Sequence, residues 1–342
     1  QVSTRNYIRT RTMLNETGSS YMDLIVYYDG LGRPFQTVFK GITPSNQNLV
    51  SLQEFDEMGR ESKSWLPVVS TSDYVAAGDF ISNAPGSYNN DSRPYYQSVY
   101  EFSPLNRMVQ QYGPGVAWHS GHSVTTEYLV NTTISPLNCI NYSVNSSGSL
   151  VNNGNYASSR LYVTKTIDED DNIGYVFIDK LERVVLTRQM KDNVPHDTYY
   201  VYDDYGNLSF VLQPMYQDNK NLSLYAFQYK YDERNRCVEK KQPGAETVKY
   251  VYDMTDKLVF SQDGNQRALG QWTFYLYDQF HRLTVKGICS NTNTSSASFS
   301  NRGRSHLRRT SRGIEPATGP DNLDTHALSL DASVRGAAKI AA

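Results

Sequence analysis

The chain has 342 residues, a formal net charge of −2 and 39% hydrophobic residues, so it is long enough to bury a substantial core. Its small net charge excludes a global field that would select nucleic acid or an anionic membrane as a partner. The absence of any run of 18 apolar residues in the sequence excludes a membrane-spanning helix. The 27 Tyr residues, against 12 Phe, fit broad sheets, because a Tyr ring can pack while its hydroxyl meets water.

The chain begins at Gln1 without Met or a signal peptide, so we expect a mature form or a fragment. Residues 1–20 are polar with little periodicity and are predicted to be a lead-in. Short segments with a period of two then follow in pairs and predict strands. One short helix is expected within residues 70–97. The predicted arms are residues 21–28, 35–39, 49–55, 61–66, 108–112, 124–130, 159–167, 174–178, 183–189, 199–202, 208–212, 223–231, 237–241, 247–252, 257–261, 272–277 and 282–287.

The segment from residue 199 to residue 214 contains the best-defined pair of arms, with Asp203-Asp204-Tyr205-Gly206 between them. Asp203 can accept a hydrogen bond from a backbone N–H two residues on, and Gly206 can adopt the positive φ that closes a hairpin. This segment therefore predicts one antiparallel β-hairpin.

The same frame recurs: an aromatic residue, Asp, two variable residues, a residue tolerant of left-handed backbone, and then Arg or Lys. Clear copies begin at Tyr28 and Phe55, and weaker ones at Phe102, Ile178, Tyr231, Tyr252 and Tyr277. Because each Asp stands where a turn needs an acceptor, we interpret the frame as structural rather than catalytic. The predicted turn residues are Asp29, Gly32, Arg33, Asp56, Gly59, Arg60, Asn106, Arg107, Asp179, Arg183, Asp203, Gly206, Asp232, Asn235, Arg236, Asp253, Asp278 and Arg282.

With this frame, the chain resembles the bacterial RHS (YD-repeat) proteins over roughly residues 21–290. The resemblance implies an all-β fold, an array of antiparallel hairpins forming a curved, spiralling sheet that is part of a hollow shell. It further implies a secreted or surface-exposed protein whose shell encloses or presents a C-terminal toxin. Members of the family carry a self-cleaving motif containing Asp-Pro, which this sequence lacks. That departure suggests a shortened member, represented by its N-terminal and repeat portion.

Spacing and composition predict four regions. After the lead-in of residues 1–20, residues 21–170 form a leading β region with widely spaced hairpins, and residues 171–290 form the regular repeat array. Residues 291–342 are rich in Ser, Thr, Asn, Arg, Gly and Ala without a strand or helix period. We expect this tail to be disordered, because it cannot bury enough apolar surface to offset its ordering entropy.

Other candidate sites are weaker. His119 and His122 could form half of a zinc site, but ligands at suitable spacing do not accompany them. The acidic residues 168–172 could hold Ca²⁺, although an ordinary charged turn is favoured there. The three Cys residues lie far apart, which favours free thiols. Because none of the common catalytic or nucleotide-binding motifs is present, we expect no enzyme activity, no cofactor and no metal.

Two functions remain open. The first is a non-catalytic scaffold, part of the β-shell of a secreted RHS-repeat protein, whose partners are the rest of the shell and an enclosed toxin. The alternative is a carbohydrate- or cell-surface-binding module that uses a Tyr-rich face of the sheet, because aromatic faces stack on sugars.

Overall fold

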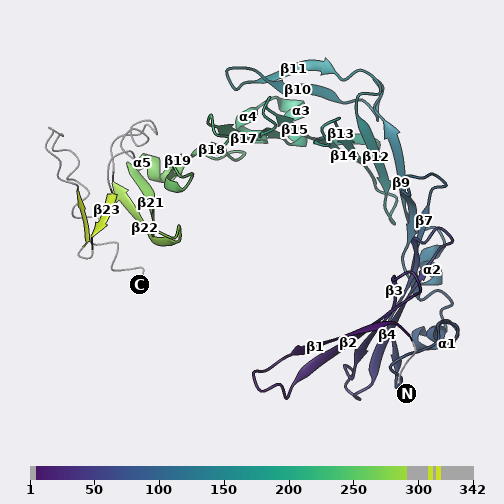
Figure 1. The fold of residues 1–342 in the computed structure, drawn as a ribbon. Helices are drawn as coiled ribbons and strands as arrows, with labels where there is room; N and C mark the ends of the chain where they lie inside the picture. The colour runs from purple at the N-terminus through teal and green to yellow at the C-terminus, as the bar shows by residue number, and fades with distance from the viewer. Residues whose placement is uncertain (1–4, 291–306, 311–312, 317–342) are drawn as a thin grey trace. The chain divides into compact units, whose positions relative to one another are not determined.

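The computed structural model describes residues 5–290, 307–310 and 313–316. Within these ranges the chain forms 24 strands, five short α-helices and one 3₁₀-helix, most of which carry labels in Figure 1. Twenty of the described strands belong to one hydrogen-bonded sheet whose paired strands run antiparallel. The prediction of an all-β array of antiparallel hairpins is therefore confirmed.

The first of two compact units contains residues 1–130, 162–176 and 189–194. Its strands pair in chain order from β1 to β4. Strand β4 pairs with both β5 and β6, and β5 leads on through β7, β8 and β9 to β12. The strands are β1 (Tyr7–Met13), β2 (Tyr21–Tyr28), β3 (Pro34–Lys40), β4 (Asn48–Phe55), β5 (Glu61–Trp65), β6 (Val68–Ser70), β7 (Tyr95–Tyr100), β8 (Met108–Tyr112), β9 (Ser123–Val130) and β12 (Tyr162–Ile167).

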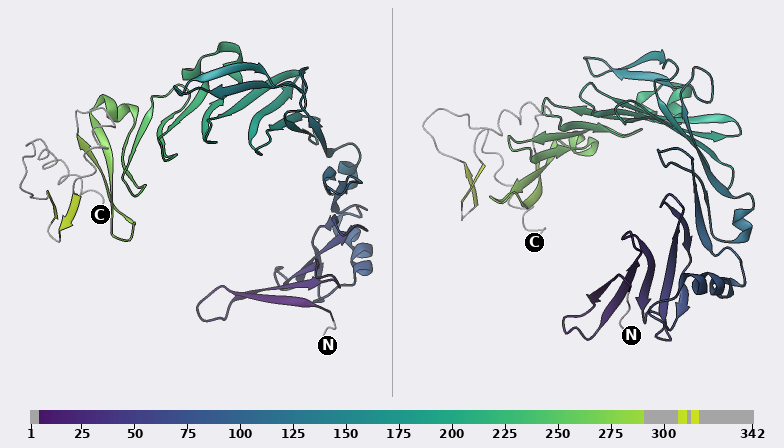
Figure 2. Two further views of the ribbon diagram at one scale, coloured as in Figure 1. Left: turned by 45° about the horizontal axis from the view of Figure 1, so that its top comes forward. Right: turned by 45° about the vertical axis from the view of Figure 1, so that its right-hand side comes forward.

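The core of this unit lies on one face of β2, β3 and β4, where Val38 and Val50 are fully buried. Helix α1 (Ala77–Asn83) and the following 3₁₀-helix η1 (Ala84–Tyr88) pack against this face through Phe80 and Ala84, and both views of Figure 2 show them beside these strands. Fully burying a Val or Phe side chain contributes about 1.5–3 kcal/mol to the free energy of unfolding. The helix expected within residues 70–97 is therefore present, and it closes the core.

Gln36 is the one long polar side chain in this part of the described core with almost no exposure. Its amide donates to the Val75 carbonyl at 2.7 Å, and its side-chain oxygen accepts from the Val75 N–H at 3.0 Å. Both polar atoms of a buried amide are thus satisfied, which avoids the free-energy cost of an unpaired group. This pair holds the segment before α1 on strand β3.

The second unit contains residues 131–161, 177–188 and 195–342. Its strands also pair antiparallel in chain order, from β15 to β22. Strands β13 (Ile173–Ile178) and β14 (Val184–Lys191) are divided between the two units. The strands of the second unit are β15 (Val194–Tyr202), β16 (Leu208–Leu212), β17 (Ala226–Tyr231), β18 (Cys237–Lys241), β19 (Val248–Tyr252), β20 (Leu258–Gln262), β21 (Gln271–Tyr277) and β22 (Leu283–Ser290).

An inserted hairpin, β10 (Ile140–Val144) and β11 (Leu150–Asn155), forms a separate two-stranded sheet in the second unit. In the views of Figures 1 and 2 this hairpin lies along β15 and helix α3 (Pro214–Asn219) of the same unit. The Tyr142 ring contacts Tyr199 of β15 and Tyr216 of α3 edge-on, with centroids 5.1 and 6.5 Å away. These aromatic contacts dock the insertion on the sheet.

The prediction that residues 1–20 are a lead-in without a strand is wrong for residues 7–13. These residues form strand β1, and all seven of them pair with β2. All seven residues of β1 are exposed. A strand with no buried face has no reason to alternate apolar and polar residues, so its sequence carries no period of two.

Helix is also more frequent than expected. Besides α1 and η1, the described residues contain α2 (Val116–His119), α3, α4 (Leu222–Tyr225) and α5 (Gly264–Ala268). Pro214 begins α3, where its fixed φ suits the first helical position. Asp263 and Gln266 form a reciprocal capping box at α5. These local signals were readable in the sequence and were missed.

Part of the tail that we expected to be disordered forms a hairpin. Strands β23 (Leu307–Thr310) and β24 (Gly313–Pro316) pair antiparallel, with Arg308 opposite Glu315. The rest of the predicted disordered tail lies outside the described residues.

Candidate functional site

The turns between paired strands share one hydrogen-bond pattern, which the Asp203 turn illustrates. The Asp203 carboxylate accepts from the N–H groups of Tyr205 and Asn207, at 3.0 and 2.8 Å. The Asp203 N–H donates to the Asn207 carbonyl, and the Gly206 N–H donates to the Asp203 carbonyl. The same pattern occurs at Asp29, Asp56, Asp179, Asp232, Asp253 and Asp278.

The fourth residue after each frame aromatic has a left-handed backbone. Gly206 has φ 85°, and Glu182, the residue type least suited to this region among them, has φ 61°. The turn geometry thus imposes the left-handed conformation even where the residue does not favour it. The other positions with positive φ in this slot are Gly32, Gly59, Asn106, Asn235, Asp256 and His281.

The Arg that closes the frame folds back on its own Asp. Its Nε donates to the second carboxylate oxygen of that Asp at 2.7–2.8 Å in the turns of Asp29, Asp56, Asp179, Asp232 and Asp278. Burial raises the pKa of Asp179 and Asp232. Hydrogen bonds from the N–H and guanidinium of the following Arg outweigh this effect, and both pKa values lie below the usual value for Asp. These two carboxylates are therefore held ionised inside their own turns.

The same Arg also reaches the next hairpin. Arg236 donates to the Asp253 carbonyl at 2.8 Å and to the Asp256 carboxylate at 2.9 Å, and its guanidinium lies 5.2 Å from the centroid of the Tyr252 ring. The Tyr252 hydroxyl in turn donates to the carbonyl of Cys237, the residue after Arg236, at 3.0 Å. We call this pair of interactions, cation over ring and hydroxyl to carbonyl, the inter-hairpin contact.

The inter-hairpin contact recurs along both units. A cation lies 4.3–5.7 Å from the ring of a Tyr in the next hairpin at Arg60–Tyr100, Arg107–Tyr128, Arg183–Tyr202 and Lys257–Tyr277. The hydroxyls of these four Tyr residues donate to the carbonyls of Glu61, Met108, Val184 and Leu258. These four Tyr hydroxyls therefore join neighbouring hairpins through the backbone.

Two hairpins use a variant of the contact. Arg33 lies 4.3 Å from the centroid of the Phe55 ring, which has no hydroxyl to donate. Asn207 replaces the cation and donates to the Asn235 side chain at 3.0 Å, while the Tyr231 hydroxyl still donates to the Leu208 carbonyl at 2.9 Å. Burial raises the pKa of Tyr231 to about 12, so its hydroxyl stays a donor at neutral pH.

The frame predicted to begin at Phe102 has the expected turn, because the Asn106 N–H donates to the Ser103 carbonyl and the Leu105 N–H to the Ser103 hydroxyl. Its aromatic residue, however, is not Phe102. Tyr100 is the aromatic residue that pairs opposite Met108, and the Glu101 N–H closes the turn on the Arg107 carbonyl. Glu101 takes the role of Asp and accepts from Arg107 Nε and Nη2, each at 2.8 Å. Two extra residues make this loop longer, and Phe102 points fully into solvent.

Two further turns are of the same kind, at Asp168, where a charged turn was expected, and at Asn145, where none was predicted. Asp168 and Asn145 each accept from the N–H groups two and four residues on, and Asp171 and Gly148 have positive φ. Neither turn contains the aromatic and basic residues by which the frame was recognised. The Asp168 carboxylate also accepts from the Asn172 side chain, so its oxygens already have protein donors. This geometry favours the turn over the calcium site.

The other candidate chemistry is not brought together. His119 packs on Tyr112, and His122 on Trp118, with Nδ1 of His122 3.0 Å from the Glu169 carbonyl oxygen. Among the described residues, no three His, Cys, Asp or Glu side chains are grouped so as to hold a metal ion. The thiols of Cys139, Cys237 and Cys289 are free, and burial raises the pKa of Cys139 to about 12. None of the helices described is long and apolar enough to cross a bilayer.

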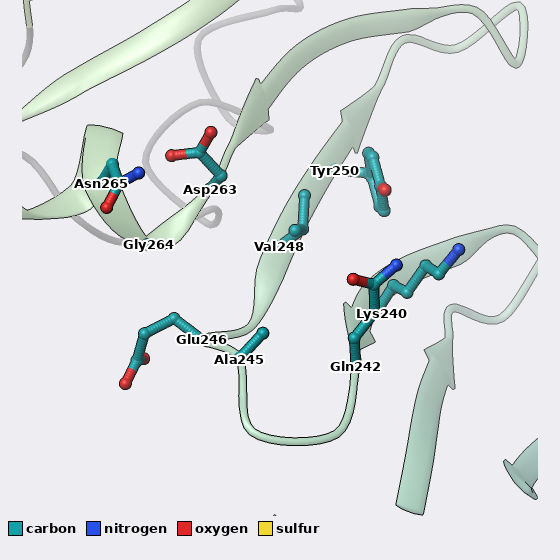
Figure 3. A pocket seen from close by; sticks show the side chains of 9 residues that line it. All are labelled: Lys240, Gln242, Ala245, Glu246, Val248, Tyr250, Asp263, Gly264 and Asn265. Atoms are coloured by element: carbon teal, nitrogen blue, oxygen red, sulfur yellow. The ribbon is translucent and has the colours of Figure 1, made fainter.

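A concave surface with a volume of about 440 Å³ lies between β18, β19 and α5 (Figure 3). Val248 and Tyr250 of β19 line it beside Lys240 and Gln242, which come from β18 and the residues just after it, and Asp263 stands at the start of the helix. Asp263 already caps α5 by accepting from the Gln266 N–H. A second hollow of similar volume is lined by Asn141, Asn155, Tyr156, Arg160 and residues of the Asp179 turn.

Residues 1–130 match the family model described as a domain of unknown function (DUF6443). No match was found among curated proteins. The chain is similar in fold to the crystal structures of TcdB2-TccC3-TEV (TM-score 0.55, 14% identity, 84% of this chain and 14% of that chain) and TcdB2-TccC3-Cdc42 (0.55, 13%, 84% and 14%). It is similar also to TcdB2-TccC3 without its hypervariable C-terminal region (0.54, 14%, 84% and 13%).

The chain therefore spans about one seventh of the length of these proteins. At such low identity the likeness concerns the fold alone. The hairpin array has the fold of the corresponding part of the TcdB2-TccC3 chains.

Proposed function

We propose that this chain is a non-catalytic scaffold, a portion of the β-shell of a secreted or surface-exposed RHS-repeat protein. In this role its partners are the rest of the shell and an enclosed C-terminal effector. The inter-hairpin contact is the observation that carries the proposal. In this contact, the basic side chain and the Tyr hydroxyl of the repeat bind the neighbouring hairpin. A continuous sheet of hairpins requires such bonds between each hairpin and the next.

The frame carboxylates support the same conclusion. Each frame Asp accepts two N–H groups of its own turn, and the Asp29, Asp56, Asp179, Asp232 and Asp278 carboxylates also bind an Arg. A general acid or base must release and regain its proton near the working pH. The pKa values of Asp29, Asp56, Asp179, Asp232 and Asp253 are held below the usual value for Asp, so these carboxylates are unsuited to that task. The RHS resemblance and the fold shared with TcdB2-TccC3 add to this argument.

The alternative is a carbohydrate-binding module, with the hollow around Tyr250 as its binding site (Figure 3). The hollow places an aromatic ring beside amide, amine and carboxylate groups, a combination that can stack on a sugar ring and hydrogen-bond to its hydroxyls. The Tyr residues of the frame argue against this function. The hydroxyls of Tyr202, Tyr231, Tyr252 and Tyr277 already donate to backbone carbonyls of the preceding hairpin.

The test is a glycan array combined with a panel of chromogenic ester, glycoside and phosphate substrates, both applied to the full chain. The scaffold predicts no saturable glycan binding and no turnover. A saturable glycan signal that is lost in Tyr250→Ala and kept in Tyr205→Ala would replace the scaffold with the binding module. Turnover that follows the protein through purification would overturn the non-catalytic assignment.

A further inference from the structure

The inserted hairpin has no part in the inter-hairpin contact. Strands β10 and β11 lie in the chain between β9 and β12, which pair with each other, and form a sheet of their own. A hollow of about 440 Å³ lies where this insertion meets the turn between β13 and β14. Small-molecule sites have volumes of about 300–1,000 Å³. This hollow, which we call the Arg160 hollow, is therefore large enough to hold a small ligand.

The Arg160 hollow is lined by hydrogen-bond donors that bind no acceptor of the protein. Tyr156, Arg160 and Lys180 line it, together with the side-chain amides of Asn141 and Asn155. Within the described part of the chain, neither the Tyr156 hydroxyl nor the side-chain nitrogens of Arg160 and Lys180 donate to a protein acceptor. Burial raises the pKa of Tyr156, so its hydroxyl keeps its proton at neutral pH.

Asp179, the one acidic residue that lines the hollow, does not neutralise these cations. Its carboxylate accepts from the N–H groups of Leu181 and Arg183 at 2.9 and 3.0 Å, and from Arg183 Nε at 2.8 Å. The Arg183 guanidinium therefore compensates its charge. The positive charges of Arg160 and Lys180 remain without a carboxylate of the protein, so the hollow suits an anion.

A buried amide holds the segment that carries Arg160. Asn131 is fully buried, and its Oδ1 accepts from the N–H groups of Arg160 and Leu161, both at 2.8 Å. Its Nδ2 donates to the Ala157 carbonyl at 2.9 Å. Ser159, whose N–H donates to the Asn131 carbonyl, has φ 60°, which is uncommon for a residue other than Gly. Such conformations persist only where the surrounding structure imposes them, and they cluster at ligand sites.

We propose that the Arg160 hollow binds a small phosphomonoester. The Arg160 guanidinium and the Lys180 ammonium bind the phosphate, and the Tyr156 hydroxyl and the amides of Asn141 and Asn155 donate to its remaining oxygens. A phosphate fits better than a carboxylate, because its three terminal oxygens accept from more donors, and a guanidinium matches its geometry. The proposal goes beyond the scaffold function, which requires no small ligand.

The rest of the lining favours an ester over inorganic phosphate. Leu181, at the tip of the turn, is 71% exposed, and Ala157 also lines the hollow. An organic group on the phosphate covers part of this apolar surface and removes it from water, which favours binding. An ester therefore gains a contact that inorganic phosphate lacks.

The experiment titrates the full chain with phenyl phosphate, inorganic phosphate and benzoate by isothermal titration calorimetry. Phenyl phosphate should bind saturably and more tightly than the other two. Arg160→Ala should weaken its binding about ten- to hundredfold, because charge-assisted hydrogen bonds are lost. Tyr156→Phe should weaken it about two- to tenfold. Lys191→Ala is the matched control, since it removes a positive charge at the far end of β14 and should leave binding unchanged.

A thermal melt of each variant checks that it is folded. Arg160 and Lys180 are exposed, so their substitution by Ala should leave the melting temperature unchanged. Absence of saturable phenyl phosphate binding would overturn the proposal, as would equal binding by the Arg160→Ala or Lys180→Ala chain. Equally tight binding of benzoate would refute the phosphate, and equally tight binding of inorganic phosphate would refute the ester. These results do not depend on glycan binding or turnover, which decide the scaffold function separately.

Discussion

Arg188 and Asp197 form a two-pronged ion pair inside the second unit, with Nε to Oδ1 at 2.7 Å and Nη2 to Oδ2 at 2.6 Å. Their side chains are 3% and 10% exposed. The remaining nitrogen, Nη1, donates to the carbonyl of Pro136 at 2.6 Å and to the carbonyl of Asn138 at 3.1 Å. Arg188 thereby ties the segment that leads into the inserted hairpin to the sheet.

We expect Arg188→Met to destabilise the protein by about 3–5 kcal/mol, because it leaves the Asp197 carboxylate and two loop carbonyls buried without their donor. Urea denaturation followed by fluorescence measures this change. The control is Lys165→Met, which removes the more exposed cross-strand pair with Glu127 and should cost about 0.2–1 kcal/mol. Equal costs for the two variants would contradict the role assigned to Arg188.

The pH dependence of stability should include a contribution from Glu101. Hydrogen bonds from the Arg107 guanidinium, then from Ser103, lower the pKa of Glu101 from 4.5 to about 2. A pKa that is lower in the folded state contributes stability above the unfolded pKa, and this stability is lost as pH falls toward the folded pKa. Urea midpoints should thus fall between pH 4.5 and pH 2, and less steeply in Glu101→Gln. A parallel decline in both proteins would show that other groups carry the effect.

Gly206→Val should destabilise the protein by more than about 1 kcal/mol, because Val is strained at φ 85°. No atom lies within 4 Å of the added Cβ, so the cost comes from the backbone alone. Gly30→Val is the matched control, since Gly30 has open space and no positive φ. Asn207→Ala, which removes two side-chain hydrogen bonds, should cost less than Gly206→Val. Thermal melts that rank these variants otherwise would refute the turn geometry.

The inter-hairpin contact predicts coupling between Arg236 and Tyr252. Tyr252→Phe should cost about 0.5–1.5 kcal/mol, because the Cys237 carbonyl loses its donor. A double-mutant cycle with Arg236→Ala should give a coupling energy of at least about 0.5 kcal/mol, since the ring and guanidinium are in contact. Tyr205→Phe, at an 83% exposed ring, should have no effect. Strict additivity in the cycle would mean that the two residues stabilise their hairpins independently.

The amino-acid sequence by itself determined the hairpins. Turn chemistry acts within four residues, so Asp203 and Gly206 could be assigned their roles from spacing alone. Strand arms with one buried face, such as β2 and β4, could be predicted from the alternation of apolar and polar residues, because burial alternates along a strand. Where that cause is absent, as in the wholly exposed β1, the sequence signal disappears with it.

Only the tertiary structure decided which contacts the frame residues of neighbouring hairpins make with one another. From the sequence, each basic residue could face either its own Asp or a neighbouring hairpin. The structure has Arg236 bound to both Asp232 and the following turn. It also decided that Tyr100, and not Phe102, belongs to the frame, and that Arg188 and Asp197 meet in the core. Such contacts join residues whose separation along the chain follows no local period. They depend on which strands lie side by side, and this is fixed only when the sheet has formed.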